Sequence, residues 1–315
     1  MVFLGTGTFA VPVLREICAR GYEVLAVITQ PDRRQGRGLQ LASPPVKLEA
    51  GRLGLEVEQP ESIRTEEFLA RIRQSAPDFL VVADFGRILP PDLLRVGKAV
   101  VNLHPSLLPR WRGPAPIERA LMAGDEVTGV TTQHVSERVD AGDIILQKEV
   151  PISPEDTAGT LRERLAREGA TLMVETLGLL SRGEDPRRPQ DEALATYAAA
   201  IRPQDEIIAW NENARQVVNR VRALEPVPGA RTFWYGSLMK VRKARLYEGP
   251  AGEGSPGQVV ALTEEGFVVA AGDGQVLVTE VQPAGKNRMG AADFLRGYPL
   301  RVGDRLQDRP EEEGS

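Results

Sequence analysis

The chain has 315 residues, a net charge of −5 at pH 7 and 42% hydrophobic residues. This length suggests two domains, and the composition is ordinary for a globular protein. One cysteine and two histidines exclude a disulfide framework, a cysteine zinc site and a histidine-rich metal site, so we expect no metal.

The charge and hydropathy patterns exclude further classes of protein. The net negative charge of the chain does not indicate nucleic-acid binding, so any nucleic acid that binds must contact local basic patches. The chain has no apolar run of membrane-spanning length, and its N-terminus lacks the features of a signal peptide. We therefore expect a cytoplasmic protein without membrane contact, and because nothing implies a stable protein partner, a monomer.

The first 30 residues predict a β-α-β unit, with strands at 1–4 and 23–29 and a helix at 8–20. This order is typical of a mostly parallel, Rossmann-like sheet. Gly5, Gly7 and Ala10 match the dinucleotide fingerprint, which leaves an NAD(P)-dependent oxidoreductase as an alternative. The acidic residue expected at the end of the second strand is absent after Ile28, which favours a plain strand-to-helix turn.

Residues 30–43 are polar and glycine-rich and predict a loop. Its arginines, Arg33, Arg34 and Arg37, can clamp a phosphate, although the pattern by itself favours a solvated surface loop. Ser43 is the expected N-cap of a helix that runs to about Gly54. A strand at 55–57, a helix at 66–74 and an apolar strand at 79–83 follow.

The stretch after residue 98 carries the chemistry. Residues 99–101 predict a buried strand, and Pro105 ends it. Asn102 and His104 are two apart, so both side chains face the same side at the end of a strand, where open α/β sheets bind ligands. An amide stabilises an oxyanion and an imidazole exchanges protons, so the pair suits acyl transfer, with Asp140 as the candidate carboxylate that orients the imidazole. A structural histidine is the alternative.

The rest of the chain predicts a helix at 116–123, strands at 129–135 and 144–150, and a long amphipathic helix at 157–181. We interpret His134, inside the first of these strands, as structural. A linker rich in glycine, proline and charge follows, then a helix at 211–224 and five short strands typical of an OB-like barrel. Lys240, Arg242 and Lys243 lie in one of these strands but not on one face, so a solvated edge strand is an alternative to a nucleic-acid contact.

Three motifs, in this order and spacing, resemble the core of the folate-dependent formyltransferases. They are Asn102-x-His104, then Ser106-Leu107-Leu108-Pro109-Arg110-x-Arg112-Gly113, then Val139-Asp140-Ala141-Gly142-Asp143-Ile144. The resemblance runs from Phe3 to about Leu306 and is strongest to the members that act on tRNA. It implies transfer of the formyl group of 10-formyltetrahydrofolate to the α-amino group of initiator methionyl-tRNA, which gives N-formylmethionyl-tRNA for translation initiation.

The resemblance also implies roles for individual residues. It makes Asn102, His104 and Asp140 catalytic, and it implies tRNA contacts at Arg33, Arg34 and Arg37, with Lys240, Arg242 and Lys243 as further candidates. Folate contacts are implied at Phe85, Gly86, Ile88, Leu89, Ser106, Leu107, Leu108, Pro109 and Val139. Two positions depart from the family pattern: Asp84 replaces an alanine, and Ala200 replaces a lysine.

The expected domains are a formyltransferase catalytic domain at 1–183, a linker at 184–203, an OB-like tRNA-binding domain at 204–307 and a disordered tail at 308–315. Three alternatives share parts of this pattern. A formyltransferase acting on a small amine and a formyl-folate hydrolase would keep the catalytic core. A non-enzymatic tRNA-binding module would leave Asn102, His104 and Asp140 unexplained.

Overall fold

The computed structural model describes residues 1–35, 40–250 and 252–309. The chain forms two compact units. The first contains Met1–Pro116, Val127–Pro151 and Arg162–Ala199, and the second contains Ile117–Glu126, Ile152–Leu161 and Ala200–Ser315. Residues 184–199, which were expected to form most of a linker, therefore belong to the first unit. The expected tail at 308–315 lies outside the described residues from 310 onward.

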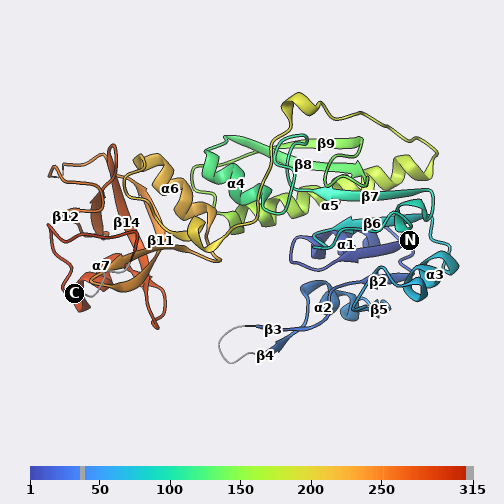
Figure 1. The fold of residues 1–315 in the computed structure, drawn as a ribbon, viewed down its shortest axis with the longest axis horizontal. Helices are drawn as coiled ribbons and strands as arrows, with labels where there is room; N and C mark the ends of the chain where they lie inside the picture. Colours follow the sequence, from blue (N-terminus) through green and yellow to red (C-terminus); the bar gives the residue numbers. More distant parts are fainter. Residues whose placement is uncertain (36–39, 251, 310–315) are drawn as a thin grey trace. The chain divides into compact units, whose positions relative to one another are not determined.

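The first unit is built on a seven-stranded sheet in the order β5-β2-β1-β6-β7-β8-β9 (Figure 1). The strands from β5 to β7 pair in parallel, and β8 and β9 are antiparallel. The mostly parallel, Rossmann-like sheet is therefore confirmed. Its strands are β1 (Val2–Gly5), β2 (Ala26–Ile28), β5 (Val57–Glu58), β6 (Phe79–Ala83), β7 (Ala99–His104), β8 (Val127–His134) and β9 (Ile144–Pro151).

Helices cover this sheet at the places where the apolar periodicity predicts them. All five residues of β6 are buried, as expected for a parallel strand covered on both faces. The chain runs outward from β1 to β2 and β5 and then returns to β6 on the other side of β1, so the strand order reverses between β1 and β6. Open α/β sheets bind ligands at such a reversal point. The helices are α1 (Ala10–Ala19), α2 (Pro45–Arg52), α3 (Glu66–Gln74) and α5 (Ala158–Ser181), with 3₁₀ turns at Leu93–Arg95 and Glu192–Leu194.

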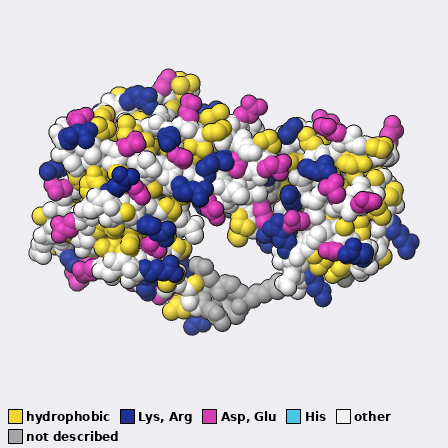
Figure 2. Space-filling view, turned by 180° about the vertical axis from the view of Figure 1, so that it is seen from behind, with side chains coloured by type: hydrophobic (Ala, Val, Ile, Leu, Met, Phe, Trp, Pro, Cys, Tyr) yellow, Lys and Arg dark blue, Asp and Glu magenta, His cyan; other side chains and the backbone are white. Residues whose placement is uncertain are grey.

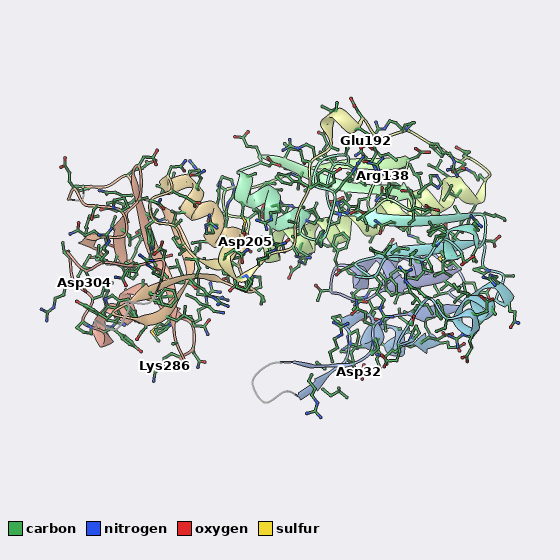
Figure 3. The ribbon with its side chains drawn as sticks, viewed as in Figure 1. Asp32, Arg138, Glu192, Asp205, Lys286 and Asp304 are labelled. Carbon is green, nitrogen blue, oxygen red and sulfur yellow. The ribbon has the colours of Figure 1, made fainter. Side chains whose placement is uncertain are left out.

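The segment predicted as a loop at 30–43 contains a small hairpin instead. Strands β3 (Arg33–Gln35) and β4 (Gln40–Ala42) pair antiparallel. Asp32 lies at the base of this hairpin (Figure 3) and accepts hydrogen bonds from Lys47 and Gln59. The prediction that Ser43 is the N-cap of α2 is wrong, because Pro44 occupies that position. The Ser43 hydroxyl instead donates to Asp32, at 3.2 Å.

The second unit is an antiparallel sheet in the order β10-β11-β14-β13-β12, with β15 added to β14. Bridges Phe233–Gln307 and Gln258–Arg305 join its two edge strands through the chain near residue 306, as a closed barrel requires. The strands are β10 (Ala230–Trp234), β11 (Ser237–Leu246), β12 (Val259–Leu262), β13 (Phe267–Ala270), β14 (Gln275–Pro283) and β15 (Met289–Gly290). This unit also contains helix α4 (Pro116–Ala123) from Ile117 onward, helices α6 (Ala214–Ala223) and α7 (Ala291–Gly297), and a 3₁₀ turn (Pro203–Glu206).

Among the helices of the described residues, none combines the length and the apolar character that crossing a bilayer requires.

Candidate active site

Strands β7 and β8 place the predicted catalytic pair. Asn102 and His104 lie at the carboxyl end of β7, and the antiparallel register sets Gln133 opposite Asn102 and Thr131 opposite His104. Asn102 is half-buried, and His104 is only 4% exposed. Because residues opposite each other on neighbouring strands project from the same face, this register delivers a second amide, that of Gln133, beside Asn102.

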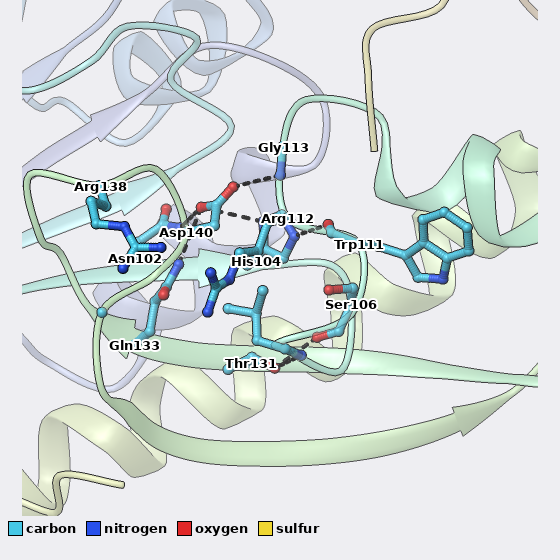
Figure 4. Close-up of polar contacts among 12 residues, drawn as sticks. Asn102, His104, Ser106, Trp111, Arg112, Gly113, Thr131, Gln133, Arg138 and Asp140 are labelled. Atoms are coloured by element: carbon cyan, nitrogen blue, oxygen red, sulfur yellow. Dashed lines mark hydrogen bonds and ion pairs between the residues drawn. The ribbon is translucent and has the colours of Figure 1, made fainter. Parts of the chain in front are cut away.

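Asp140 lies against this pair, although it is far from both in sequence (Figure 4). Its Oδ2 accepts the amide of Gly113 at 2.8 Å, and its Oδ1 accepts Gln133 Nε2 at 3.1 Å. Asn102 Nδ2 lies 3.5 Å from the same Oδ1. Asp140 has a φ of 51°, a left-handed conformation that a non-glycine residue keeps only when its surroundings hold it.

The imidazole of His104 is held from two sides. Its Nε2 lies 2.8 Å from the carbonyl oxygen of Trp111, and its Nδ1 lies 3.6 Å from Asp140 Oδ1. Since a carbonyl only accepts, the Nε2–H donates to Trp111 and Nδ1 is the nitrogen that faces the carboxylate. The structure thus brings together all three residues that were predicted to be catalytic.

The loop after β7 is fastened to β8 through Thr131. The Thr131 hydroxyl donates to the carbonyl of Ser106 at 2.7 Å and accepts the amide of Leu108 at 3.2 Å. The Ser106 hydroxyl donates to the carbonyl of Arg110 at 2.6 Å. Ser106 and Leu108 are buried, so their side chains shape the loop, while Leu107 and Pro109 are half-buried.

The other residues predicted to bind folate differ in exposure. Phe85 and Leu89 are buried, and the Phe85 carbonyl accepts from Thr6 and Gln30. Ile88 and Val139, in contrast, are 62% and 54% exposed. Gly86 is exposed and has a φ of 70°. Ile88 and Val139 therefore present apolar surface, while Phe85 and Leu89 support the loop from inside.

Gly142 explains the glycine of the Val139–Ile144 motif. A Cβ at this position would lie 1.7 Å from the carbonyl oxygen of His134, so only glycine lets the loop pass this close to the end of β8. His134 itself takes no part in the site: its Nε2 lies 2.9 Å from Asp185 Oδ1. Burial, reinforced by Arg187 and opposed by Asp185, lowers the pKa of His134.

The glycine turn after β1 does not suit a dinucleotide. A Cβ at Gly7 would lie 1.9 Å from Asp84 Oδ2, so the Asp84 carboxylate lies where a fingerprint turn brings a pyrophosphate close to the backbone. The Asp84 carbonyl also accepts the amides of Thr6 and Gly7, at 3.0 and 3.3 Å. Because a carboxylate repels phosphate, this arrangement speaks against the NAD(P) alternative and identifies the turn as a strand-to-helix connection.

The predicted tRNA-binding residues fall into two groups. Arg33, Arg34 and Lys243 are exposed, and Arg37 lies outside the described residues. Lys240 Nζ donates to the carbonyl of Pro228 at 2.7 Å, and the Arg242 guanidinium, whose side chain is only 11% exposed, donates to the carbonyl of Pro226 at 2.8 Å and pairs with Glu225. Arg242 is therefore engaged inside the barrel unit. Basic and acidic side chains alternate over the face seen in Figure 2.

Several groups at the site were not predicted from the sequence. They are the side chain of Gln133, the carbonyl of Trp111, the amide of Gly113 and the side chain of Gln190, which donates to the Asp140 and Gly142 carbonyls. For Gln133, the only signal in the sequence was its position in the predicted strand at 129–135, which pairs with β7 in the structure. Gln190 lay in the expected linker, where composition carries no sign of a site. Within the described residues, no three His, Cys, Asp or Glu side chains gather as a metal site.

Comparison with known proteins gives the family. Residues 1–177 match the family model described as formyl transferase, and residues 200–299 match that of the formyl transferase C-terminal domain. The chain belongs to the formyl transferase family. The methionyl-tRNA formyltransferase of Moorella thermoacetica is 50% identical over 97% of this chain and 98% of its own length. That of Halalkalibacterium halodurans is 46% identical over 94% of each chain. These matches confirm the predicted family and enzyme class.

Solved structures with the same fold are more distant in sequence. HypX from Aquifex aeolicus, in complex with tetrahydrofolic acid, aligns with a TM-score of 0.67 and 20% identity over 100% of this chain, which spans 49% of that protein. The sugar 3N-formyl transferase WlaRD, determined in the presence of dTDP and 5-N-formyl-THF, aligns with a TM-score of 0.68 and 18% identity over 91% of this chain and 98% of its own. At these identities the likeness establishes the fold alone.

Proposed function

We propose that the chain transfers the formyl group of 10-formyltetrahydrofolate to the α-amino group of initiator methionyl-tRNA, in the cytoplasm and as a monomer. The observation that carries the proposal is the convergence of Asn102, His104 and Asp140 at the carboxyl end of β7. The names of the relatives, which match over nearly the whole chain, support methionyl-tRNA as the acceptor.

The side chains beside this set fit a flat, partly apolar donor. In the proposal, 10-formyltetrahydrofolate is the substrate that supplies the formyl group. Ile88 and Val139, both exposed, offer apolar surface to its ring system. The loop at Leu107 to Pro109, fastened by Thr131, borders the same strand end and forms the other side of the proposed contact.

Asn102 stabilises the charge that forms on the formyl oxygen. When the amine nitrogen bonds to the formyl carbon, the carbonyl electrons move to the oxygen, which needs a donor in place. Asn102 Nδ2 makes only a long contact of 3.5 Å with Asp140, so its N–H groups are available to this oxygen. A preorganised donor of this kind typically contributes about 10²–10³ in rate.

His104 and Asp140 handle the protons. The reaction forms a bond from the amine nitrogen to the formyl carbon and breaks the bond from that carbon to the folate nitrogen, so the amine loses one proton and the folate nitrogen gains one. The Trp111 carbonyl fixes the His104 ring through Nε2, so proton exchange falls to Nδ1, which faces Asp140 at 3.6 Å. Since this distance exceeds a direct hydrogen bond, a bridging water or the incoming amine completes the relay.

Contacts to tRNA are assigned to exposed basic residues. Arg33 and Arg34 on β3, with Arg37 outside the described residues, offer guanidinium groups that match phosphate geometry. Lys243 on β11 is the exposed candidate in the second unit. Arg242, paired with Glu225, supports the barrel instead, and Lys240 is partly engaged with the Pro228 carbonyl.

A formyl transfer assay tests the proposal. The purified chain is given 10-formyltetrahydrofolate with initiator methionyl-tRNA, with elongator methionyl-tRNA, with a small amine and with no acceptor. Formylation that favours initiator methionyl-tRNA supports the proposal. Formylation of the small amine alone, or folate release without an acceptor, would replace it with one of the two alternatives that keep the core. In the same assay, Asn102→Ala should lose about 10²–10³ in turnover.

A further inference from the structure

A buried guanidinium, that of Arg112, begins a hydrogen-bonded chain that ends at Asp140. Arg112 is 1% exposed. Its Nη1 and Nη2 donate to the two carboxylate oxygens of Glu192 at 3.1 and 3.0 Å, and its Nε and Nη2 donate to Gln190 Oε1 at 3.0 and 2.9 Å. A buried charge requires such partners, and Glu192, which also pairs with Arg138 at 2.9 Å, supplies the opposite charge.

Arg112 determines which way the amide of Gln190 points. A guanidinium only donates, so Gln190 must turn its oxygen toward Arg112 and its nitrogen away. That nitrogen, Nε2, then faces three oxygens: the carbonyls of Gly142 at 2.7 Å and Asp140 at 2.9 Å, and Gln133 Oε1 at 3.1 Å. Gln190 thereby holds the backbone on both sides of Ala141.

The same logic sets the amide of Gln133. Its oxygen accepts from Gln190, so its nitrogen is the end that reaches Asp140 Oδ1, at 3.1 Å. The chain runs from Arg112 through Gln190 and Gln133 to the carboxylate, and every link donates in the same direction. Hydrogen bonds aligned in this way polarise one another, so the positive charge of Arg112 strengthens the donor that faces Asp140.

We propose that Gln190 is a positioning residue for the reaction, which holds Asp140 through its backbone carbonyl and, by way of Gln133, through its carboxylate. The inference rests on the proposed function. Asp140 has a φ of 51°, a conformation that needs outside support. Gln190 supplies that support from a segment that composition marks as a linker. Residues 196–198 fasten the same segment to the loop after β7, where the Arg112 amide donates to the Thr196 carbonyl at 2.9 Å and the Ala198 amide donates to the Arg112 carbonyl at 2.7 Å.

The test compares three single variants in the formyl transfer assay. Gln190→Met keeps the volume and removes the donors, and Gln190→Glu keeps the shape and replaces the donating nitrogen with an oxygen. Gln275→Glu is the matched control, because its half-buried amide also donates to a backbone carbonyl, that of Gly252 at 3.0 Å, in the other unit. A misplaced catalytic group typically costs about 10²-fold in rate.

The expected result is a split between kcat and KM. Both Gln190 variants should lose about 10²-fold in kcat, with KM for either substrate changed by less than about threefold, because neither substrate is expected to contact Gln190. Gln275→Glu should keep the kcat of the unaltered chain. A Gln190→Met protein with kcat within about threefold of the unaltered chain, or with a raised KM and an unchanged kcat, would overturn the proposal.

A double variant separates positioning from a general loss of structure. If Gln190 and Gln133 act on the same carboxylate, kcat of Gln133→Met/Gln190→Met should lie within about threefold of the slower single variant. Losses that multiply would show independent effects and overturn the chain of action. Failure of the unaltered chain to formylate methionyl-tRNA refutes the proposed function instead, so the two failures are distinguishable.

Discussion

Replacing Asp140 with asparagine perturbs one atom of the site and several of its contacts. The carboxylate accepts the Gly113 amide through Oδ2 at 2.8 Å and Gln133 Nε2 through Oδ1 at 3.1 Å, and it faces Asn102 and His104. An asparagine has only one acceptor oxygen. Whichever way its amide turns, an NH₂ group faces either the Gly113 amide or the Gln133 amide, and one donor loses its partner.

The expected magnitudes follow from this count of contacts. One buried donor left without a partner costs about 1–3 kcal/mol of the free energy of unfolding. Loss of the carboxyl group that faces His104 should lower the single-turnover formylation rate by about 10²–10⁴, the usual contribution of a positioned acid–base group. The two effects are measured separately, by denaturant unfolding and by rapid quench with saturating substrates.

Asp143→Asn is the control, since Asp143 lies three residues along the same segment, is half-buried, and contacts β8 through its backbone carbonyl, which accepts the His134 amide at 2.9 Å. It undergoes the same chemical change outside the set and should keep the rate of the unaltered chain. An Asp140→Asn protein that formylates within about fivefold of the unaltered chain would refute the reasoning. So would an equal loss in both variants.

Three further predictions concern stability and tRNA affinity. Burial lowers the pKa of His134, so the neutral ring stabilises the fold above the ordinary pKa of 6.5, and this stability is lost as pH falls toward the lowered value. The Tm of the unaltered chain should therefore fall more steeply below pH 6.5 than that of His134→Gln. Parallel curves of Tm against pH would contradict this. Arg242→Ala leaves the buried Glu225 with one partner fewer and should cost about 2–4 kcal/mol of the free energy of unfolding. Arg245 is exposed, so Arg245→Ala should cost less than about 0.5 kcal/mol. Equal costs for the two variants would contradict this prediction. Lys243→Ala should leave Tm unchanged and reduce the salt dependence of tRNA binding by about one phosphate contact, so an unchanged slope would remove Lys243 from the interface.

Local pattern was enough to predict most elements of the fold. The apolar run that ends at Pro105 predicted β7, and the period of two placed Asn102 and His104 on one face, as the structure has them. The β-α-β start and the antiparallel strands of the second unit are likewise encoded by short-range periodicity. The hairpin at β3 and β4 was missed, because its polar, glycine-rich composition is equally typical of a loop.

Contacts between distant segments were beyond such patterns. Asp140 was a candidate from its side-chain chemistry, and the family resemblance supported it, but nothing local marked Gln190 as its neighbour. Arg242 was a candidate for tRNA contact because its charge was visible and its partner, Glu225, was not. A charged residue in a strand gives the same sequence pattern whether its side chain faces solvent or a buried carboxylate.

The sequence by itself determined which segments become strands and helices, and that an amide and an imidazole share one face at a strand end, because backbone periodicity and side-chain chemistry are local properties. Only the tertiary structure decided what surrounds them. The register of β7 against β8 placed Gln133 beside Asn102. The close approach of Gly142 to the carbonyl oxygen of His134 let the loop bring Asp140 to the imidazole of His104. Burial of Arg112 then oriented Gln190 toward Asp140, since a buried guanidinium must find acceptors wherever the fold supplies them.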